Sequence, residues 1–188
     1  MNTPRFDFLD TDLPGLKLVR RKALEDHRGF LERMYCGEAF LEAGFPLAIS
    51  QINHTLTKRI GTVRGLHFQR PPHAETKLVT CLRGRVFDVA VDLRVGSSTF
   101  LHWHGVVLSP ANLASLLIPE GFAHGFQTLE ADCELLYLHS SPHRPEAEDG
   151  LHPLDPALAI PWPQEVVDLS TRDRSRQMIQ LPFKGLAL

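Results

Sequence analysis

The sequence lacks the features that define disulfide-rich, exported and membrane-spanning proteins. Only three cysteines, Cys36, Cys81 and Cys133, occur among 188 residues, and no two of them form a C-x-x-C pair. An odd number of widely spaced cysteines predicts neither a disulfide framework nor a zinc knuckle. No apolar run approaches the roughly 20 residues that a membrane span needs, and the N-terminal stretch MNTPRFDFLDTDLPG has no apolar core. We therefore expect a protein without membrane contact in the reducing cytoplasm.

The sequence also has no excess of charge of one sign. Twenty basic and 22 acidic residues are spread along the chain and give a net charge of −2, so no basic face for a nucleic acid is expected. An anionic ligand must therefore be bound by a local cluster of cations. With 188 residues, 43% of them hydrophobic, the chain is expected to form one domain, residues 1–188, with a sizeable core.

Helical periodicity is scarce, and strand patterns dominate. The clearest helix candidate is GEAFLEAGF at residues 37–45, where Phe40 and its neighbours fall near helical spacing and Gly44 supplies an end. Breaks rich in Gly, Pro and polar residues then separate eight segments typical of strands. These segments are residues 47–57, 63–69, 77–82, 85–94, 98–109, 115–121, 125–129 and 133–139. Many short strands predict an all-β sandwich or barrel, followed from about Ser140 by an irregular tail.

The sequence KLVTCL-RG-RVFDVAVDLR predicts a hairpin, with Arg83-Gly84 as its turn. Alternation in its second strand places Phe87, Val89, Val91 and Leu93 on one face and Val86, Asp88, Ala90 and Asp92 on the other. Asp88 thus has apolar neighbours on its own face. We expect it to be a partly enclosed acid, because a carboxylate in such surroundings is seldom freely solvated.

Metal binding is one alternative for this chain. His102 and His104, in the sequence HWH, are expected on one face of a strand, as in metal-binding barrels, and His67 and His124 are candidate further ligands. No carboxylate follows His104 within the next several residues. The simpler interpretation, two partly exposed strand histidines and no metal, is therefore preferred.

Nucleophilic catalysis has weaker support. Cys81 lies between apolar residues, and Cys133 lies between Asp132 and Glu134, whose negative charge opposes thiolate formation. No G-x-S-x-G motif is present. Neither cysteine is expected to be activated.

A phosphate site and a proton-transfer site remain as candidates. Arg28, Arg64 and Arg172 each stand beside strand or turn signals, and converging guanidinium groups bind diphosphate bidentately. Taken singly, each is more simply a surface arginine. The proton-transfer candidates are His67, Lys77, His124, Tyr137 and Asp173, since a carboxylate-held imidazole is a good base near neutral pH and a tyrosine can serve as acid. A lone strand histidine is more often a packing residue, and that alternative stays open for His67.

Three longer motifs carry a resemblance to a known family. They are RGLHFQRPPHAETKLVTCLRGRVFDVAVDLRVGSSTF, IPEGFAHGFQTL and LDPALAIPWP. From about Asp26 to Asp173 the chain resembles the dTDP-4-dehydrorhamnose 3,5-epimerase family. The resemblance implies a cupin-type jelly-roll barrel, a homodimer with the N-terminal segment (about residues 1–25) at its interface, and activity without metal or cofactor. It further implies epimerisation of a dTDP-4-keto-6-deoxy-hexose at C3 and C5, on the way to dTDP-L-rhamnose.

The resemblance also implies roles for individual residues. His67 in RGLH is the base, and Asp173 in STRD orients it and stabilises the imidazolium. Tyr137 in ELLY returns a proton from the opposite side. Lys77 in TKLV faces the enolate, where a fixed positive charge stabilises the developing oxyanion. The substrate-binding positions implied in the same way are Arg28, Glu32, Gln51, Asn53, Arg64, Asp88, His124, Glu148 and Arg172, with a buried, hydrogen-bonded structural acid as the alternative for Asp88.

One segment departs from the family pattern. After the tyrosine the family reads K-T-T-D-Y-Y-x-P-E, whereas this chain reads LHSSPHRPE, so Pro142 and His143 replace an aromatic pair. Stacking in that wall must differ. The departure leaves open a mono-epimerase acting at C3 or C5 of a related dTDP-, CDP- or GDP-linked 4-keto sugar. Two further classes stay open as well, a metal-dependent cupin and a non-catalytic sugar-binding barrel.

Overall fold

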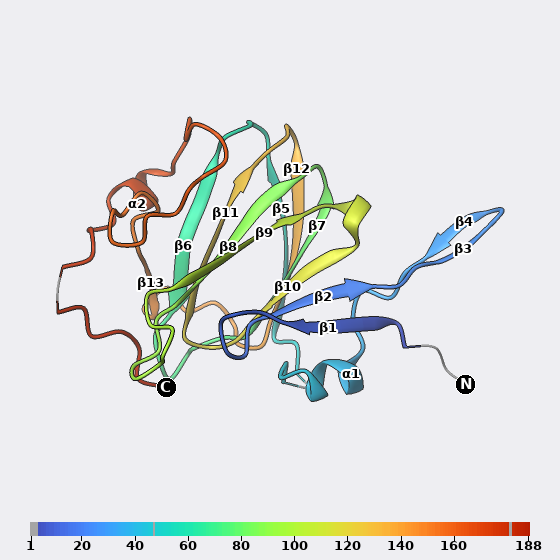
Figure 1. Cartoon of the computed structure of the whole chain (residues 1–188), viewed down its shortest axis with the longest axis horizontal. Coiled ribbons are helices and arrows are strands. Elements are labelled where there is room, and N and C mark those ends of the chain that lie inside the picture. The colour runs from blue at the N-terminus through green and yellow to red at the C-terminus, as the bar shows by residue number, and fades with distance from the viewer. Residues whose placement is uncertain (1–3, 47, 181) are drawn as a thin grey trace.

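Two antiparallel sheets form a barrel-like sandwich in the computed structural model, which describes residues 4–46, 48–180 and 182–188. The first sheet has the order β1-β2-β10-β7-β12-β5. Its strands are β1 (Phe6–Asp10), β2 (Lys17–Arg21), β10 (Ala114–Ile118), β7 (Lys77–Arg83), β12 (Cys133–His139) and β5 (Gln51–Thr57). The two sheets face one another in Figure 1, so the all-β jelly-roll prediction is confirmed.

The second sheet has the order β13-β6-β11-β8-β9. Its strands are β13 (Glu148–Gly150), β6 (Val63–Gln69), β11 (Phe122–Thr128), β8 (Val86–Asp92) and β9 (Trp103–Leu108). The other elements are the hairpin of β3 (Leu24–Asp26) and β4 (Gly29–Leu31), helices α1 (Gly37–Glu42) and α2 (Thr171–Arg174), and the 3-10 helix η1 (Pro110–Asn112). Within the described ranges, no helix is long and apolar enough to cross a membrane.

Three hydrophobic clusters hold the layers together. The first lies between the sheets, where Leu116 and Leu135 of one sheet meet Ala90 and Phe126 of the other. The second lies on the outer face of the second sheet, where the C-terminal tail covers it with residues such as Leu158. The third lies outside the first sheet, under α1. Both sheets are thus covered on both faces, which explains why their central strands carry apolar residues on both sides.

Helix α1 confirms the helix candidate at residues 37–45, and α2 and η1 agree with the expectation of a few short helices. Phe40 is fully buried against the first sheet. Gly44 follows the helix with φ +102°, and the backbone N–H of Phe45 donates to the carbonyl of Phe40 at 2.8 Å. A glycine in this conformation closes a helix at little steric cost, so Gly44 ends α1 as expected.

The predicted hairpin at Arg83-Gly84 is wrong. Strand β7 pairs with β10 and β12, whereas β8 pairs with β11 and β9. The Arg83-Gly84 turn therefore carries the chain from one sheet to the other at the end of the barrel. Sequence alternation cannot distinguish this corner from a hairpin, because Gly84 with its φ of +76° suits both.

Several predicted strand boundaries also need correction. The segment expected as a strand from residue 98 begins only at Trp103, because Ser97 and Thr99 turn inward to the buried carboxylate of Asp92. His102 therefore precedes the strand and is exposed, so it does not share a strand face with His104 as expected. Strand β11 starts three residues earlier than predicted, and β5 starts at Gln51, while Leu47 lies outside the described residues.

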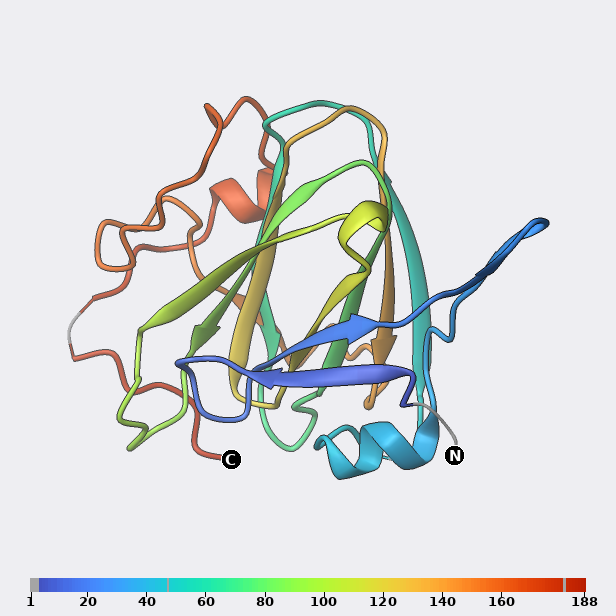
Figure 2. The same cartoon turned by 45° about the vertical axis from the view of Figure 1, so that its right-hand side comes forward.

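The sequence analysis predicted no strand before residue 47, yet four are present there. Strands β1 and β2 extend the first sheet, and β3 and β4 form a separate hairpin that projects away from the barrel (Figure 2). These strands are short and partly polar, which is why their pattern is weak. The tail after Ser140 is irregular apart from β13 and α2, as predicted.

Candidate active site

A β-bulge in β6 determines which side chains of this strand face the candidate site. In the pairing of β6 with β11, His67 lies opposite His124 and Arg64 lies opposite Phe126, so Gly65 and Leu66 together oppose Gly125. Residues three apart on a regular strand point to opposite faces, but one extra residue reverses that alternation. Arg64 and His67 consequently both line the same cavity.

Close approach of the two strands at the bulge requires glycine. A Cβ atom on Gly65 would lie 2.6 Å from the Cα of Gly125 and 2.8 Å from the carbonyl oxygen of His124. Gly65 also has φ +127°, which side chains rarely adopt. The RGLH motif therefore fixes backbone shape as well as supplying the histidine.

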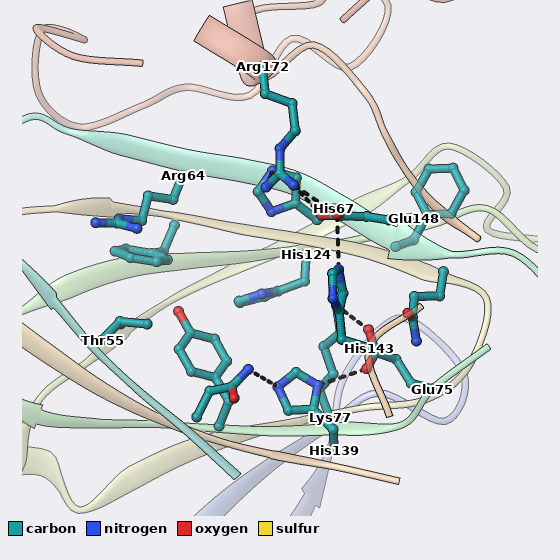
Figure 3. A pocket seen from close by; sticks show the side chains of 15 residues that line it. Thr55, Arg64, His67, Glu75, Lys77, His124, His139, His143, Glu148 and Arg172 are labelled. Carbon is teal, nitrogen blue, oxygen red and sulfur yellow. Dashed lines mark hydrogen bonds and ion pairs between the residues drawn. The ribbon is translucent and has the colours of Figure 1, made fainter. Parts of the chain in front are cut away.

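The cavity lies between the two sheets and has a volume of about 280 Å³ (Figure 3). Both sheets and the C-terminal tail contribute to its wall. Its lining residues are Asn53, Thr55, Arg64, His67, Phe68, Gln69, Glu75, Lys77, His124, Phe126, Tyr137, His139, His143, Glu148 and Arg172. Eight of the residues singled out from the sequence are among them: His67, Lys77, Tyr137, Asn53, Arg64, His124, Glu148 and Arg172.

His67 is held by a buried carboxylate. Its Nε2 lies 2.6 Å from Oδ1 of Asp173, whose side chain is 3% exposed. The second oxygen of Asp173 accepts a hydrogen bond from the backbone N–H of Gly65 at 3.3 Å, and the backbone N–H of Asp173 donates to Oγ of Ser170 at 3.0 Å. Burial alone would raise the pKa of Asp173, but its hydrogen bond to His67 and the further bond from Gly65 lower it below the ordinary value. The ionised carboxylate keeps the hydrogen on Nε2, which leaves Nδ1 as the basic nitrogen.

Tyr137 comes from β12 in the opposite sheet. Burial and the nearby carboxylate of Asp88 raise the pKa of Tyr137 well above its ordinary value, so its phenol is protonated at neutral pH. Its ring meets the ring of His124 edge-on, with 6.1 Å between centroids. The cavity thus has a carboxylate-held imidazole on one wall and a proton-bearing phenol on the other.

A second histidine–carboxylate pair lies deeper between the sheets. Nε2 of His124 lies 2.9 Å from Oδ1 of Asp88, and both side chains are buried. Among the described residues, none donates to Oδ2 of Asp88. The enclosed position predicted for Asp88 is confirmed, and the carboxylate reaches the cavity only through His124.

Lys77 lies in a network with two residues that the sequence analysis did not single out. Its Nζ is 3.0 Å from Oε1 of Glu75, and Oε2 of Glu75 is 2.7 Å from Nδ1 of His139. Burial alone would raise the pKa of Glu75, but the positive charge of Lys77 and the hydrogen bond from His139 lower it below its ordinary value. Glu75 stands two residues before Lys77 in HAETK, but its pairing with His139 depends on β7 lying beside β12, which the sequence does not show.

Arg172 joins the cavity from the C-terminal tail. Its Nη1 lies 2.7 Å from Oε1 of Glu148, and its Nη2 lies 3.4 Å from Nε2 of His67. Nε2 of His143 lies 3.1 Å from Oε2 of Glu148. Glu148 therefore lies between Arg172 and His143 and contacts both, as Figure 3 shows.

The segment that departs from the family pattern is firmly attached to the barrel. The backbone N–H of His143 donates to Oε1 of Gln51 at 2.9 Å, and that of Arg144 donates to Oε1 of Gln69 at 2.6 Å. The amide of Gln69 also donates to the carbonyl of Pro142 at 3.3 Å. His143 is thus a fixed part of the wall, and Gln51 supports it from behind.

Four predicted binding residues do not line this cavity in the chain itself. Gln51 and Asp88 lie behind His143 and His124, which do line it. Arg28 lies at the tip of the β3–β4 hairpin and pairs with Asp26 at 2.6 Å. Glu32 pairs with the buried Arg21 at 2.9 Å, at the base of the hairpin.

The metal and cysteine hypotheses lack a matching arrangement. Across the described ranges, no three His, Cys, Asp or Glu side chains are grouped so as to hold a metal ion. All three cysteines are free. Burial and the neighbouring Cys133 raise the pKa of Cys81 to about 12, so its thiol is not a nucleophile at neutral pH.

The fold and the cavity together define a class of protein. A cupin-like barrel with a carboxylate-held imidazole on one wall, a phenol on the other and cations around both has the groups of an enzyme of the acid–base type, suited to proton transfer at carbon. A family model described as dTDP-4-dehydrorhamnose 3,5-epimerase matches residues 10–180. The chain therefore belongs to the dTDP-4-dehydrorhamnose 3,5-epimerase family, as the sequence motifs predicted.

Individual relatives agree with this assignment. The chain is 42% identical over 177 residues to a dTDP-4-dehydrorhamnose 3,5-epimerase of Sinorhizobium fredii, covering 93% of this chain and 91% of that protein. It is 43% identical over 168 residues to a dTDP-4-dehydrorhamnose 3-epimerase of Streptomyces niveus, covering 89% and 81%. The crystal structure of dTDP-6-deoxy-D-glucose-3,5-epimerase from Legionella pneumophila, in complex with dTDP-4-keto-L-rhamnose, superimposes with a TM-score of 0.87 at 39% identity and covers 92% of both chains.

Proposed function

We propose that this protein inverts C3 and C5 of a dTDP-linked 4-keto-6-deoxy-hexose, in biosynthesis of the dTDP-L-rhamnose type. The observation that supports this most directly is the opposition of His67, with Asp173 behind it, to the protonated Tyr137 across one cavity. Inversion at carbon requires a base on one face and an acid on the other. We further propose that residues 1–188 act as one catalytic domain in the cytoplasm, where the three free cysteines stay reduced.

The proposed reaction begins at His67. A hydrogen on a carbon next to the C4 ketone is acidic because the electron pair left behind is delocalised onto the ketone oxygen as an enolate. His67 takes this proton on its free nitrogen, and the carboxylate of Asp173 stabilises the imidazolium that forms. Tyr137 then donates its proton to the opposite face of the same carbon, which inverts the centre. The tyrosinate and the imidazolium return to their starting states by exchange with water.

Lys77 and the arginines have separate tasks in this proposal. Lys77 lies in the cavity wall and stabilises the negative oxygen of the enolate, the type of contact that accounts for much of enzymatic rate enhancement. Arg64 and Arg172 bind the diphosphate with charge-assisted hydrogen bonds. Asn53, His124 and Glu148 shape the remaining wall, and Gln51 supports it through His143. A local group of cations can thus hold an anionic substrate on a chain whose net charge is −2.

We propose that Arg28 completes the site of a second copy of the chain. The β3–β4 hairpin projects from the barrel, and Phe30 and Leu31 on it are 67% and 70% exposed. An isolated two-stranded hairpin is marginally stable in water, so these apolar side chains need a partner surface. In a homodimer that surface is the neighbouring subunit, and the ion pair between Glu32 and Arg21 anchors the hairpin to its own barrel.

Inversion at a single carbon is the second candidate. A relative from Streptomyces niveus, 43% identical, is named a 3-epimerase. His143, fixed by Gln51 and Glu148 in the cavity wall, replaces an aromatic residue of the family pattern and changes the shape that the sugar meets. The same experiment separates the two candidates.

The test is incubation with dTDP-4-keto-6-deoxyglucose in deuterium oxide, followed by NMR. Deuterium at both C3 and C5 supports the proposed double inversion, and deuterium at one carbon establishes a mono-epimerase. If neither carbon exchanges in this or in CDP- or GDP-linked 4-keto sugars, the proposed function is wrong.

The residue assignment is tested by His67→Ala. General acid–base catalysis contributes about 10²- to 10⁴-fold, so exchange should fall by that factor while the affinity for dTDP stays nearly unchanged. His54→Ala is the matched control, because His54 is exposed and pairs with Glu134 outside the cavity. Unfolding of the His67→Ala variant, with exchange restored where the protein folds, would instead support the packing role for His67.

A further inference from the structure

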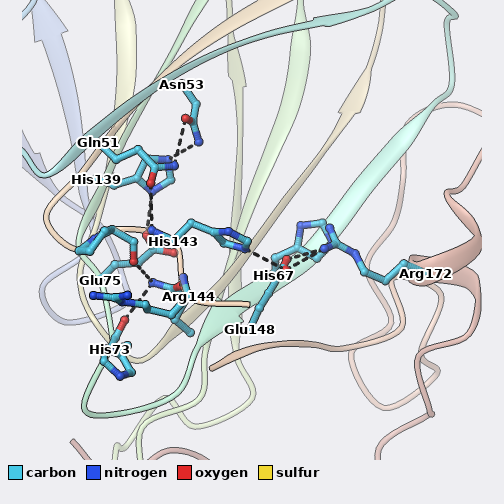
Figure 4. Close-up of polar contacts among 12 residues, drawn as sticks. Gln51, Asn53, His67, His73, Glu75, His139, His143, Arg144, Glu148 and Arg172 are labelled. Carbon is cyan, nitrogen blue, oxygen red and sulfur yellow. Dashed lines mark hydrogen bonds and ion pairs between the residues drawn. The ribbon is translucent and has the colours of Figure 1, made fainter. Parts of the chain in front are cut away.

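A buried chain of three ionisable side chains lies beside Tyr137, and the reaction as described uses only Lys77 of the three. The chain runs from Lys77 (Figure 3) through Glu75 to His139 (Figure 4). The exposed fractions of the three side chains are only 9%, 9% and 12%. His139 and Lys77 are direct partners in the pairing of β12 with β7. His139 stands where the family pattern K-T-T-D-Y-Y has its first threonine.

We propose that His139 is a positioning residue that controls, through Glu75, the net charge that Lys77 presents to the reacting sugar. This inference rests on the proposed function, because it concerns the role of Lys77 there. His139 contacts Glu75 directly and influences the substrate through Lys77.

The geometry divides the Glu75 carboxylate between two partners. One oxygen is 3.0 Å from the ammonium group of Lys77, and the other is 2.7 Å from Nδ1 of His139. Because Glu75 is ionised, it keeps a hydrogen on Nδ1 of His139. Nε2 of His139 is then the nitrogen that gains or loses a proton, and it lies 3.4 Å from the side-chain amide of Asn53.

The consequence is a change of one unit of charge at the cavity wall. With neutral His139, Glu75 cancels the charge of Lys77. With protonated His139, the three groups together carry one positive charge. An enolate oxygen nearby favours the protonated state, and charges act more strongly in a cavity that excludes water than in bulk solvent. Protonation of His139 should therefore accelerate enolate formation.

The surroundings of His139 allow this change when the amide of Asn53 turns over, because Nδ2 of Asn53 donates to a neutral Nε2 and Oδ1 accepts from a protonated one. Neutral Asn53 faces it from β5, and the ring of Tyr137 on β12 is nearly parallel to its own, at 19° and 6.0 Å between centroids. The charged groups that it meets are Glu75 from the segment before β7 and Lys77 on β7. The other cavity histidines, His67, His124 and His143, each have a carboxylate of their own.

The test compares three proteins over the pH range in which imidazoles titrate. His139→Asn keeps a donor for Glu75 but carries no titratable ring, and Glu75→Gln removes the charge that cancels Lys77. All three proteins need a neutral His67 as the base, so the pH dependence of His67 is common to them and cancels in ratios of kcat. The ratio of the wild-type kcat to that of His139→Asn should fall by roughly tenfold, toward one, as the pH rises through this range. The ratio of Glu75→Gln to His139→Asn should keep the higher value at every pH. KM and the affinity for dTDP should change little in both variants.

A second measurement does not depend on catalysis. The ring proton of His139 is followed by NMR against pH, and is assigned by its loss in His139→Asn. Glu75→Gln should shift the midpoint of this titration to lower pH, because a carboxylate no longer stabilises the imidazolium. An unchanged midpoint, or a ratio of wild-type kcat to His139→Asn kcat that does not change with pH, overturns the inference. Absence of exchange in the wild type overturns the proposed function itself, and the NMR midpoint still decides whether Glu75 and His139 are coupled.

Discussion

At the scale of single residues, three of the four aspartates buried among the described residues face a cation or an imidazole. Asp173 faces His67 and Asp88 faces His124 beside the cavity, whereas Asp92 faces Arg94 at the end of the barrel. The fourth, Asp155, accepts hydrogen bonds from two backbone N–H groups instead. An ionised carboxylate without such partners is costly in the protein interior. In the proposed mechanism the first two pairs serve chemistry, and the pair of Asp92 with Arg94 serves stability.

Asp92 should contribute to stability in a pH-dependent way. Its carboxylate accepts hydrogen bonds from Arg94, Ser97 and Thr99. Burial alone would raise the pKa of Asp92, but these bonds outweigh it and lower the pKa to about 2. Asp92→Asn should lower the free energy of unfolding at pH 7 by about 3 kcal/mol, as for breaking a buried ion pair. Urea unfolding measures this loss.

The sign of the pH dependence follows from the depressed pKa. The stability that Asp92 confers is complete above the unfolded-state pKa, about 4, and is lost as the pH falls toward 2. The difference between the wild type and Asp92→Asn should therefore shrink between pH 4 and pH 2. Asp10→Asn, at a side chain that is 80% exposed, should change stability by less than about 1 kcal/mol. An equal difference at pH 7 and pH 3 would contradict the assignment.

At the scale of strands, the sequence predicted the identity of the cavity residues more accurately than their positions in the fold. The motif around His67 identified a histidine that lines the cavity and is held by a carboxylate, and the alternation around Asp88 identified an enclosed acid. The spacing of Arg64 and His67 placed them on opposite faces of a regular strand, and only the bulge brings both to the cavity. The hairpin prediction failed for a related reason, because pairing between β7 and its neighbours is a long-range property that local alternation does not encode.

The bulge itself can be tested by Gly65→Ala. The new Cβ would collide with Gly125, and the backbone N–H that Gly65 donates to Asp173 would shift. Strain and collision together should cost roughly 3 kcal/mol or more in the free energy of unfolding, and exchange at the sugar should fall as His67 moves.

Gly44→Ala is the control for backbone strain. Gly44 also has a positive φ, +102°, but apart from its chain neighbours no atom of the described residues lies within 4 Å of the position of its Cβ. It should cost about 1 kcal/mol and leave exchange intact. Equal losses in both variants, measured by urea unfolding, would show that backbone strain alone accounts for Gly65.

At the scale of the whole molecule, the projecting hairpin is the part that sequence analysis predicted least well. Arg28 and Glu32 were predicted to bind the substrate, but no local sequence pattern predicts that β3 and β4 project away from the barrel. In one chain, Arg28 and the cavity are separate. Their proposed connection is a property of two subunits, which neither residue spacing nor a single chain can display.

Mixing two inactive variants tests this connection. In a mixed dimer of Arg28→Ala and His67→Ala subunits, one cavity has an intact His67 and receives an intact Arg28 from the other subunit. Random pairing should then restore about a quarter of the wild-type activity per site, if the hairpins cross between subunits. Exchange assays on refolded mixtures measure this. Mass spectrometry verifies that heterodimers have formed. If activity does not recover in such mixtures, Arg28 acts in the site of its own chain or in neither site of the dimer.

Gly65 and Gly125 lie at the bulge where β6 pairs with β11, and this bulge limits which insertions and deletions the strand can accept. The extra residue in β6 reverses the alternation of side chains between the two faces of the sheet. Residues before Gly65 therefore follow the opposite alternation from residues after Leu66. Deletion of one residue here would turn Arg64 outward and Val63 inward while leaving every residue type in place. Insertions and deletions in β6 should therefore be tolerated only in pairs, whereas the loops at either end of the strand can change length one residue at a time.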